Sequence, residues 1–294
     1  MPKGHPSRLT SILIMGLAYV LSGVVGTAIV WFSPEMDPLN HMIYADLAAT
    51  LVIFAFSVAL NNSSLYDPYW SIIPPAIVTY WALGSGYSFG TVAALSMILV
   101  WLWGIRLTWN FLRGWPGLVH EDWRYINIRN FSKKLYWPAS LLGIHLFPTA
   151  IVFAGLYPIY LAISSPAIAS EALVYAGSAL CLLAIAIETI ADEQLRTFVQ
   201  SGPVKGSYLK TGLWSIVRHP NYLGENLFWW SLALVGYGAT QEWACFIGAV
   251  SMTAMFVFAS IPMIDKRMLE RRPHYAEHKA KTPALFPWKG PRPS

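Results

Sequence analysis

The sequence predicts an all-α fold: a polytopic membrane bundle of about seven to eight transmembrane helices, with both termini in the cytoplasm. The first observation is composition, because 55% of the 294 residues are hydrophobic and only 12% are charged, at a mean hydropathy of +0.46. An ordinary soluble domain has about 25% charged residues. The second is that the apolar residues form long runs, and the third is that the basic residues lie to one side of these runs. No stretch has the alternating pattern of a membrane β-barrel.

Eight apolar runs are candidates for helices that cross a hydrocarbon core of about 30 Å. The third and seventh are short, so seven spans are the alternative to eight. The first run follows Lys3 and Arg8, as the core of a signal peptide would, but it is too long for one and is expected to remain as a membrane anchor. In chain order the runs cover residues 9–32, 42–60, 70–83, 91–112, 136–163, 171–198, 222–237 and 243–264.

The positions of the 20 lysines and arginines predict the orientation. With eight spans, all of them fall on one side of the membrane, and the loops around 33–41, 84–90, 164–170 and 238–242 contain none. The positive-inside rule makes the basic side cytoplasmic. The net charge of +5 is therefore explained by topology and by contact with membrane lipids, and it does not indicate a nucleic-acid partner.

The two cysteines and the uninterrupted pattern of the chain fit a single membrane domain. Cys181 and Cys245 both lie inside predicted spans, where ordinary packing accounts for them. They indicate neither a disulfide nor a metal site. Since no repeat, linker or low-complexity stretch interrupts the chain, residues 1–294 are expected to form a single integral membrane domain.

Residues 61–70, between the second and third runs, are rich in hydrogen-bonding groups but hold no basic residue, unlike a typical solvated inner loop. One interpretation is structural, with Pro68 starting the third helix and the polar side chains capping or turning the chain. In the other, Tyr66, Asp67 and Tyr69 line a functional site.

A polar stripe ends the fourth run. Arg106, Asn110 and Arg113 share one helical face by their spacing. Arg113 could extend to the membrane surface from the helix end, whereas Arg106 lies deeper and is expected to face a cavity or a carboxylate. The loop at 120–125 mixes charged and aromatic residues. It predicts either an interfacial aromatic belt with local ion pairs or the edge of a ligand pocket.

The sixth run carries charged residues near its cytoplasmic end. Glu188, Asp192 and Arg196 are spaced by four residues, so they share one face of a helix. Glu188 lies well inside the run, where an acid needs a partner or water.

The seventh helix is expected to begin near Pro220, because proline disfavours helix at the residue before it and suits the first turn. Such a helix start has free N–H groups, which together with Arg218 and Lys210 predict a phosphate site. Asn221 and Glu225, one turn apart, could bind a ribose or an amide.

Four segments together resemble the steroid 5α-reductase superfamily, above all its broad bacterial branch of largely uncharacterised membrane proteins. They read WGIRLTWNFLRG, ETIADEQLRTF, GLWSIVRHPNYLGE and PHYAEHKAKTPALFPW, and the resemblance covers about residues 60–290. Sterol reductases share an Arg-His-x-Asn-Tyr-x-Gly version of the third segment. The resemblance implies an NADPH-dependent membrane reductase of an activated C=C bond in an enone-like lipid or steroid-like substrate. The expected location is the bacterial inner membrane, with the active site toward the cytoplasm.

The resemblance also implies which residues hold the cofactor. Asn221 and Glu225 would contact its nicotinamide and ribose part, and Arg113 its phosphate oxygens. Asp192, Arg196 and Tyr208 would line its phosphate and adenine part. The other expected cofactor-binding residues are Arg106, Asn110, Glu188, Lys210, Arg218, His219 and Tyr222.

The chain departs from the steroid enzymes in the substrate half. Trp103 stands where they carry a tyrosine that helps polarise the substrate carbonyl, and Asp265 stands where they carry a histidine. A glutamate on one of their earlier helices has no identified counterpart. The reaction needs a group that polarises the carbonyl and a proton donor in a dry pocket. Tyr66, Asp67 and Tyr69 are expected to be these catalytic groups.

Two other function classes stay open. Isoprenylcysteine carboxyl methyltransferases carry a similar Arg-His-Pro-x-Tyr-x-Gly motif and use it to hold S-adenosylmethionine. The spare basic groups favour a cofactor with several phosphates, that is NADPH, over S-adenosylmethionine. A lipid-binding or transport protein is the third class, but the polar residues gather at one membrane face and no inverted repeat is visible.

Overall fold

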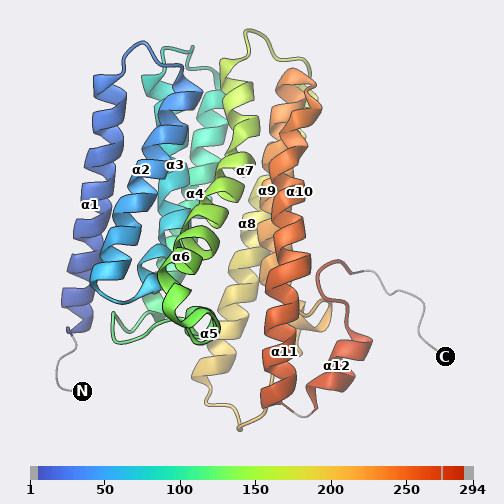
Figure 1. Cartoon of the computed structure of the whole chain (residues 1–294). Helices are drawn as coiled ribbons and strands as arrows, with labels where there is room; N and C mark the ends of the chain where they lie inside the picture. The colour runs from blue at the N-terminus through green and yellow to red at the C-terminus, as the bar shows by residue number, and fades with distance from the viewer. Residues whose placement is uncertain (1–5, 273, 288–294) are drawn as a thin grey trace. The chain divides into compact units, whose positions relative to one another are not determined.

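The computed structural model describes residues 6–272 and 274–287, which form helices, turns and loops without a strand (Figure 1). The predicted all-α fold class is therefore confirmed for this part of the chain. Five residues that entered the orientation or resemblance arguments lie outside the described residues: Lys3, Pro273, Trp288, Lys289 and Arg292.

The chain divides into two compact units, Met1–Leu156 and Tyr157–Ser294. The boundary falls inside a continuous helix, α7 (Phe147–Ser164). No linker or change of composition marks it, which is why the sequence alone predicts a single domain.

The first unit contains the helices before α7 and the first part of α7 itself. They are α1 (Arg8–Phe32), α2 (Pro38–Ala59), η1 (Ser63–Tyr66), α3 (Tyr69–Thr79), η2 (Tyr80–Gly84), α4 (Thr91–Gly114), α5 (Trp123–Ser132), η3 (Lys133–Leu135), α6 (Tyr136–Ser140) and η4 (Leu141–Leu146).

The helices of the second unit follow α7. They are α8 (Glu171–Gln200), η5 (Gly212–Ser215), α9 (Pro220–Thr240), η6 (Trp243–Phe246), α10 (Ile247–Met255), η7 (Phe256–Ser260), α11 (Ile261–Arg271) and α12 (Tyr275–Lys281).

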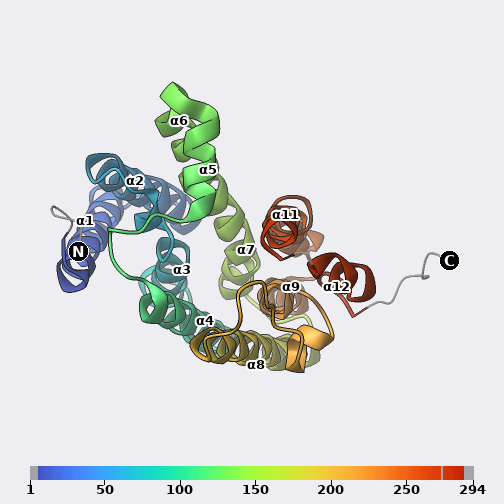
Figure 2. The same ribbon diagram turned by 90° about the horizontal axis from the view of Figure 1, so that it is seen from below.

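In the first unit, α1 packs beside α2 and α3 beside α4 (Figure 2). The α3–α4 contact is close because α4 carries Gly104 there. A Cβ atom at Gly104 would lie 2.5 Å from the carbonyl oxygen of Ser71 on α3. Such small residues let membrane helices approach closely and gain van der Waals contact. The loop that follows α2 is thereby held next to α4.

In the second unit, α8 and α9 pack against each other along much of their length (Figure 2). α9 begins at Pro220, as predicted, with His219 as the residue before its first turn. A Cβ atom at Gly224 would lie 2.6 Å from the Cβ atom of Glu188 on α8. The predicted cofactor-binding residues of α8 and α9 are therefore brought together by a glycine contact.

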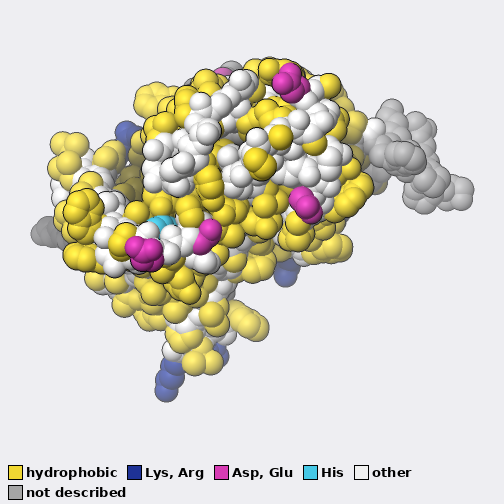
Figure 3. All heavy atoms as spheres, turned by 90° about the horizontal axis from the view of Figure 1, so that it is seen from above, with side chains coloured by type: hydrophobic (Ala, Val, Ile, Leu, Met, Phe, Trp, Pro, Cys, Tyr) yellow, Lys and Arg dark blue, Asp and Glu magenta, His cyan; other side chains and the backbone are white. Residues whose placement is uncertain are grey.

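Six helical stretches in the described part of the chain are long and apolar enough to cross a membrane. Their outer faces expose large apolar side chains such as Leu13, Leu17 and Val20 of α1. Figure 3 views the helices end-on from above, and few Lys, Arg, Asp or Glu side chains are visible on that surface. These features are those of an integral membrane protein. The expected short runs at 70–83 and 222–237 are helical but are not among the six. The six stretches are Arg8–Phe32, Pro38–Ala59, Thr91–Gly114, Trp123–Ser164, Glu171–Gln200 and Trp243–Arg271.

Candidate functional site

A carboxylate–phenol pair lies inside the first unit, between α2 and α3. The hydroxyl of Tyr69 donates to Oδ1 of Asp46 at 2.8 Å, and both residues are only 2% exposed. The other carboxyl oxygen of Asp46, Oδ2, has no hydrogen-bond partner among the described residues. A buried acceptor without a partner is costly, and an acid in a membrane-spanning helix is rare outside functional sites. The pair therefore has an unused oxygen to offer to a ligand.

Asp46 lines a cavity of about 230 Å³ whose walls come from α1, α2 and α3. Of the described residues that line it, Asp46 is the only acid or base. Met42, Ala49, Ile73 and Ile77 represent the mostly apolar walls. Ser22, Thr27 and Tyr80 add hydroxyl-bearing side chains to the lining. Mostly apolar walls with a few polar groups are typical of sites that bind an apolar molecule and orient it.

A chain of buried hydroxyl groups surrounds the pair. Tyr66 and Thr149 share a hydrogen bond of 2.8 Å between their hydroxyls, and Thr149 shares another of 3.0 Å with Thr50. The rings of Tyr66 and Tyr69 lie 5.4 Å apart, and the Tyr66 ring also lies 5.0 Å from the ring of His145. These contacts fix the orientation of both tyrosines. The structure thus places Tyr66 beside Tyr69, where its ring packs against the Tyr69 ring and its hydroxyl is held by Thr149.

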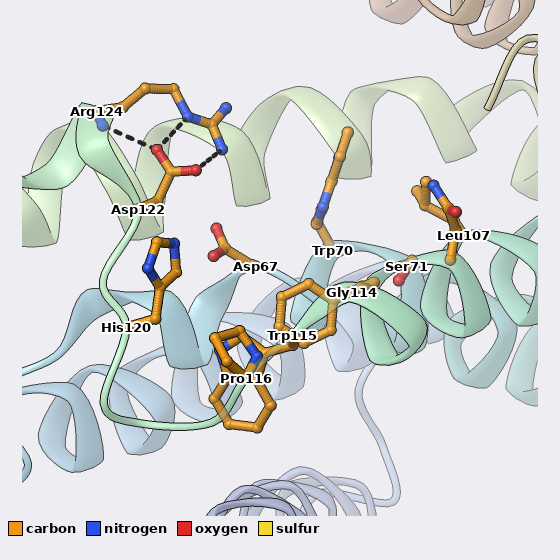
Figure 4. Close-up of a pocket in the computed structure, with 12 residues that line it drawn as sticks. Asp67, Trp70, Ser71, Leu107, Gly114, Trp115, Pro116, His120, Asp122 and Arg124 are labelled. Atoms are coloured by element: carbon orange, nitrogen blue, oxygen red, sulfur yellow. Dashed lines mark hydrogen bonds and ion pairs between the residues drawn. The ribbon is translucent and has the colours of Figure 1, made fainter. Parts of the chain in front are cut away.

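Asp67 lines a different cavity (Figure 4). Its carboxylate accepts a hydrogen bond from the hydroxyl of Tyr125. Burial raises the pKa of Asp67 to about 6, although the nearby Arg124 charge works in the opposite direction. Asp67 and Tyr69 are close in sequence, but the structure does not place Asp67 in the Asp46–Tyr69 pair.

This second cavity has a volume of about 490 Å³ and receives residues from the predicted polar loop at 120–125. Asp122 accepts hydrogen bonds from Nε and a terminal nitrogen of Arg124, at 2.8 and 3.2 Å. Burial opposes ionisation of Asp122, but the hydrogen bonds and charge of Arg124 hold its pKa below the ordinary value. The loop thus lines a cavity and also forms the local ion pairs Arg124–Asp122 and Arg129–Glu121, so features of both interpretations are present.

The polar stripe on α4 also forms. Arg113 donates to the side-chain oxygen of Asn110 at 2.9 Å, and Asn110 lines the cavity of Figure 4. Arg106 is half-buried about two turns earlier on the helix.

In the second unit, the side chains of Arg218 and His219 are engaged by the end of the chain. Arg218 pairs with Asp265 of α11 at 2.6 Å and donates to the carbonyl oxygens of Thr282 and Lys279 at 2.5 and 3.2 Å. His219 lies 3.3 Å from Asp265. These contacts fasten the C-terminal segment to the start of α9. A role for Arg218 in binding a phosphate group would compete with them.

Two of the predicted cofactor-binding residues in the first turns of α9 are held by aromatic neighbours. Tyr222 stacks on His219, with ring centroids 5.6 Å apart. Glu225 is buried and accepts a hydrogen bond of 2.8 Å from the indole of Trp229. Asn221 is half-buried at the second position of the helix.

The remaining predicted residues lie on α8 and in the loop after it. Asp192 and Arg196 follow Glu188 along one face of α8, and Arg196 is in no ion pair within the described residues. Tyr208 is placed with the C-terminal helix α12, where its ring lies 5.1 Å from that of His278. Lys210 is exposed. The structure therefore brings Glu188 against Gly224 at the start of α9, but it groups Tyr208 with α12.

Asp46 is a candidate site residue that the sequence analysis did not single out. The sequence did carry a signal for this residue, because Asp46 is an acid inside the second apolar run, about two turns from the start of α2. His145, fully buried and 3.2 Å from the hydroxyl of Ser57, was missed in the same way. Neither residue belongs to a recognisable sequence motif, and only the fold shows what each one contacts.

Comparison with known proteins identifies the family. Residues 53–282 match the family described as "Protein of unknown function (DUF1295)", and the chain belongs to this family. The chain is also similar to "Uncharacterized protein C594.04c" of the fission yeast Schizosaccharomyces pombe, with 27% identity over 262 residues, which cover 80% of this chain and 76% of the yeast protein. No solved structure matches the chain significantly.

Proposed function

We propose that this member of the DUF1295 family is an NADPH-dependent membrane reductase that saturates an activated C=C bond in an enone-like lipid or steroid-like substrate. The observation that carries the proposal is the Asp46–Tyr69 pair. Asp46 lines a mostly apolar cavity, and its Oδ2 has no hydrogen-bond partner among the described residues. A substrate that enters this cavity is hydrophobic, and the group it presents to Asp46 is a polar atom such as a carbonyl oxygen. The pair replaces the tyrosine and glutamate expected from the steroid enzymes.

Asp46 and Tyr69 have the chemistry for the proton half of the reaction. A carboxyl group in an apolar surrounding is favoured in its neutral form, and it can then donate a hydrogen bond to a carbonyl oxygen. Tyr69 fixes its orientation through the 2.8 Å hydrogen bond. Stronger polarisation of the carbonyl in the transition state than in the ground state would accelerate reduction at the β-carbon.

Some of the residues on α8 and α9 and in the loop between them suit a dinucleotide cofactor. NADPH, when bound, supplies the hydride. Asn226, next to Glu225, has a buried side-chain oxygen without a hydrogen-bond partner among the described residues, which suits a ligand N–H group. Arg196 and Lys210 are available for phosphates, together with the N–H groups at the start of α9. Asn221 and Glu225 remain the proposed contacts for the ribose and nicotinamide.

The engagement of Arg218 by Asp265 keeps one alternative open. It removes one of the basic groups that favoured a cofactor with several phosphates. A membrane methyltransferase of the isoprenylcysteine carboxyl methyltransferase type, which binds S-adenosylmethionine, is therefore the second candidate.

Topology and location belong to the same proposal. We place α3 and α9 across the membrane in addition to the six apolar stretches, which gives eight spans with both termini in the cytoplasm. The active site then faces the cytoplasm, and the membrane is the bacterial inner membrane.

Isothermal titration of the detergent-purified protein with NADPH, NADH and S-adenosylmethionine tests the cofactor. Saturable NADPH binding that is lost in Asn221→Ala/Glu225→Gln is expected. Binding of S-adenosylmethionine alone would replace the reductase by the methyltransferase, and binding of none of the three would remove both.

Turnover of steroid enones with NADPH, followed by the loss of NADPH absorbance, tests the substrate half. Asp46→Asn and Tyr69→Phe are each expected to lower kcat by about 10²–10³-fold, the effect of removing one group that stabilises an oxyanion, with unchanged NADPH affinity. Tyr44→Phe is the matched control, because Tyr44 lies on the same helix with an exposed side chain. Full activity in both variants would contradict the assignment of the pair.

A further inference from the structure

Neither Asp46 nor Tyr69 lines the cavity of Figure 4, and of the expected cofactor-binding residues its lining includes Asn110 alone among the described residues. Its walls come from the loop before α3 and the start of α3, from the end of α4, and from the loop between α4 and α5 with the start of α5. α4 is one of the apolar stretches that can cross a membrane, and the cavity begins at its last two turns. A cavity at this level lies where lipid head groups meet the end of a spanning helix.

The lining carries an excess of acid. Asp67 and Asp122 contribute two carboxylates, whereas Arg124 is the one guanidinium among the lining residues. In Figure 4 the Asp67 carboxylate lies between the Asp122–Arg124 pair and the rings of Trp70 and Trp115. Carboxylates next to indole faces are the surroundings that bind an ammonium group, through charge and through cation–π contact.

The same cavity has donors that need an acceptor. The indole N–H of Trp115 has no acceptor among the described residues, and Trp115 is only 4% exposed. A buried N–H without an acceptor is costly, so a ligand oxygen at this point is favourable. Arg124 uses Nε and one terminal nitrogen on Asp122, and its other terminal nitrogen has no hydrogen bond to the described residues. Together these donors suit a phosphate.

We propose that this cavity binds the zwitterionic head group of a phospholipid, with the ammonium group near Asp67 and the tryptophan faces and the phosphate near Trp115 and Arg124. The two halves of the lining match the two charges of such a head group, and the position at the end of α4 matches the depth at which lipids present it. Phosphatidylethanolamine and phosphatidylcholine both have this chemistry, whereas phosphatidylglycerol has the phosphate without the ammonium group.

Native mass spectrometry of the full chain from mixed micelles with equal amounts of the three lipids tests the proposal. The wild-type protein is expected to retain phosphatidylethanolamine or phosphatidylcholine about tenfold over phosphatidylglycerol, the ratio that corresponds to about 1.4 kcal/mol. Trp115→Phe, which removes the N–H but keeps an aromatic ring, and Asp67→Asn are each expected to lower that retention severalfold.

Glu35→Gln is the matched control, since Glu35 is an exposed acid in the turn between α1 and α2. Equal retention of all three lipids by the wild-type protein, or unchanged retention in both variants, would overturn the proposal. If Asp67→Asn does not fold, Trp115→Phe decides alone. Competition by water-soluble glycerophosphoethanolamine at micromolar concentration would assign the site to a free phosphoammonium compound instead of a membrane lipid.

Discussion

At the scale of single residues, two polar side chains that are close in sequence have different surroundings. Tyr69 points its hydroxyl to Asp46, and Asp67 lines the cavity that holds Asp122 and Arg124. The reason is local, because the chain turns from η1 into α3 between these two residues, and side chains two positions apart do not share a helical face. Sequence proximity alone therefore does not decide whether Asp67 and Tyr69 belong to one site.

Asp67 should make the stability of the protein depend on pH. Its pKa is raised from 3.8 to about 6, so between these values the folded protein holds a proton that the unfolded chain has released. Stability contributed by this group is complete below the unfolded pKa and is lost as pH rises through about 6. The melting temperature of the wild-type protein is expected to fall from pH 4 to pH 6, within the range of these two values, and Asp67→Asn should flatten that fall. An identical slope in both proteins would contradict the raised pKa.

At the scale of helices, close contacts depend on glycine. Gly104→Ala would place a Cβ atom 2.5 Å from the Ser71 carbonyl and 2.7 Å from the Pro75 ring. Overpacking of this kind costs about 1–3 kcal/mol, so a lower melting temperature is expected in detergent. Gly16→Ala is the control, because a Cβ atom there meets nothing within 4 Å. A similar loss in both variants would show that the effect does not come from the α3–α4 contact.

The Arg218–Asp265 ion pair connects α9, α11 and the C-terminal segment. Both side chains are buried, with 7% and 5% exposure. Asp265→Asn would leave a buried arginine without its counter-charge, which costs about 3–5 kcal/mol. Hydrogen exchange of residues 274–287 is expected to accelerate, because their attachment depends on Arg218.

The exposed Lys281–Glu277 pair provides the control for that experiment. Its side chains are 73% and 70% exposed, and surface pairs contribute about 0–1 kcal/mol. Lys281→Ala should therefore leave hydrogen exchange almost unchanged. Unaltered exchange in Asp265→Asn would mean that the C-terminal segment is held by other contacts.

At the scale of the whole molecule, the number of membrane spans is open to a direct test. Six stretches qualify by length and composition within the described residues, and the proposed eight requires α3 and α9 to cross as well. Single cysteines at Glu35, Tyr87, Lys134 and Lys205, labelled in intact cells with a reagent that does not cross membranes, test whether α3 crosses. Labelling of the first two alone is expected. Labelling of Lys134→Cys would mean that α3 does not cross.

Composition and periodicity alone determined the fold class and the location of the helices. Long apolar runs cannot satisfy their backbone groups in lipid except as helices, so all eight expected runs are helical. The start of α9 was predictable for an equally local reason, since Pro220 fixes its own backbone angle and disfavours helix at His219.

Only the tertiary structure decided which polar residues meet. Asp46 and Tyr69 are 23 positions apart and Arg218 and Asp265 are 47 apart, and no local rule fixes such pairs. The packing of α2 on α3 pairs Asp46 with Tyr69 and leaves its Oδ2 without a partner among the described residues, whereas the return of the C-terminal segment takes up Arg218. Hydrophobic patterning sets which segments are helices. The partners of a buried charge depend on how those helices pack, because the charge must find its counterpart wherever the fold brings one.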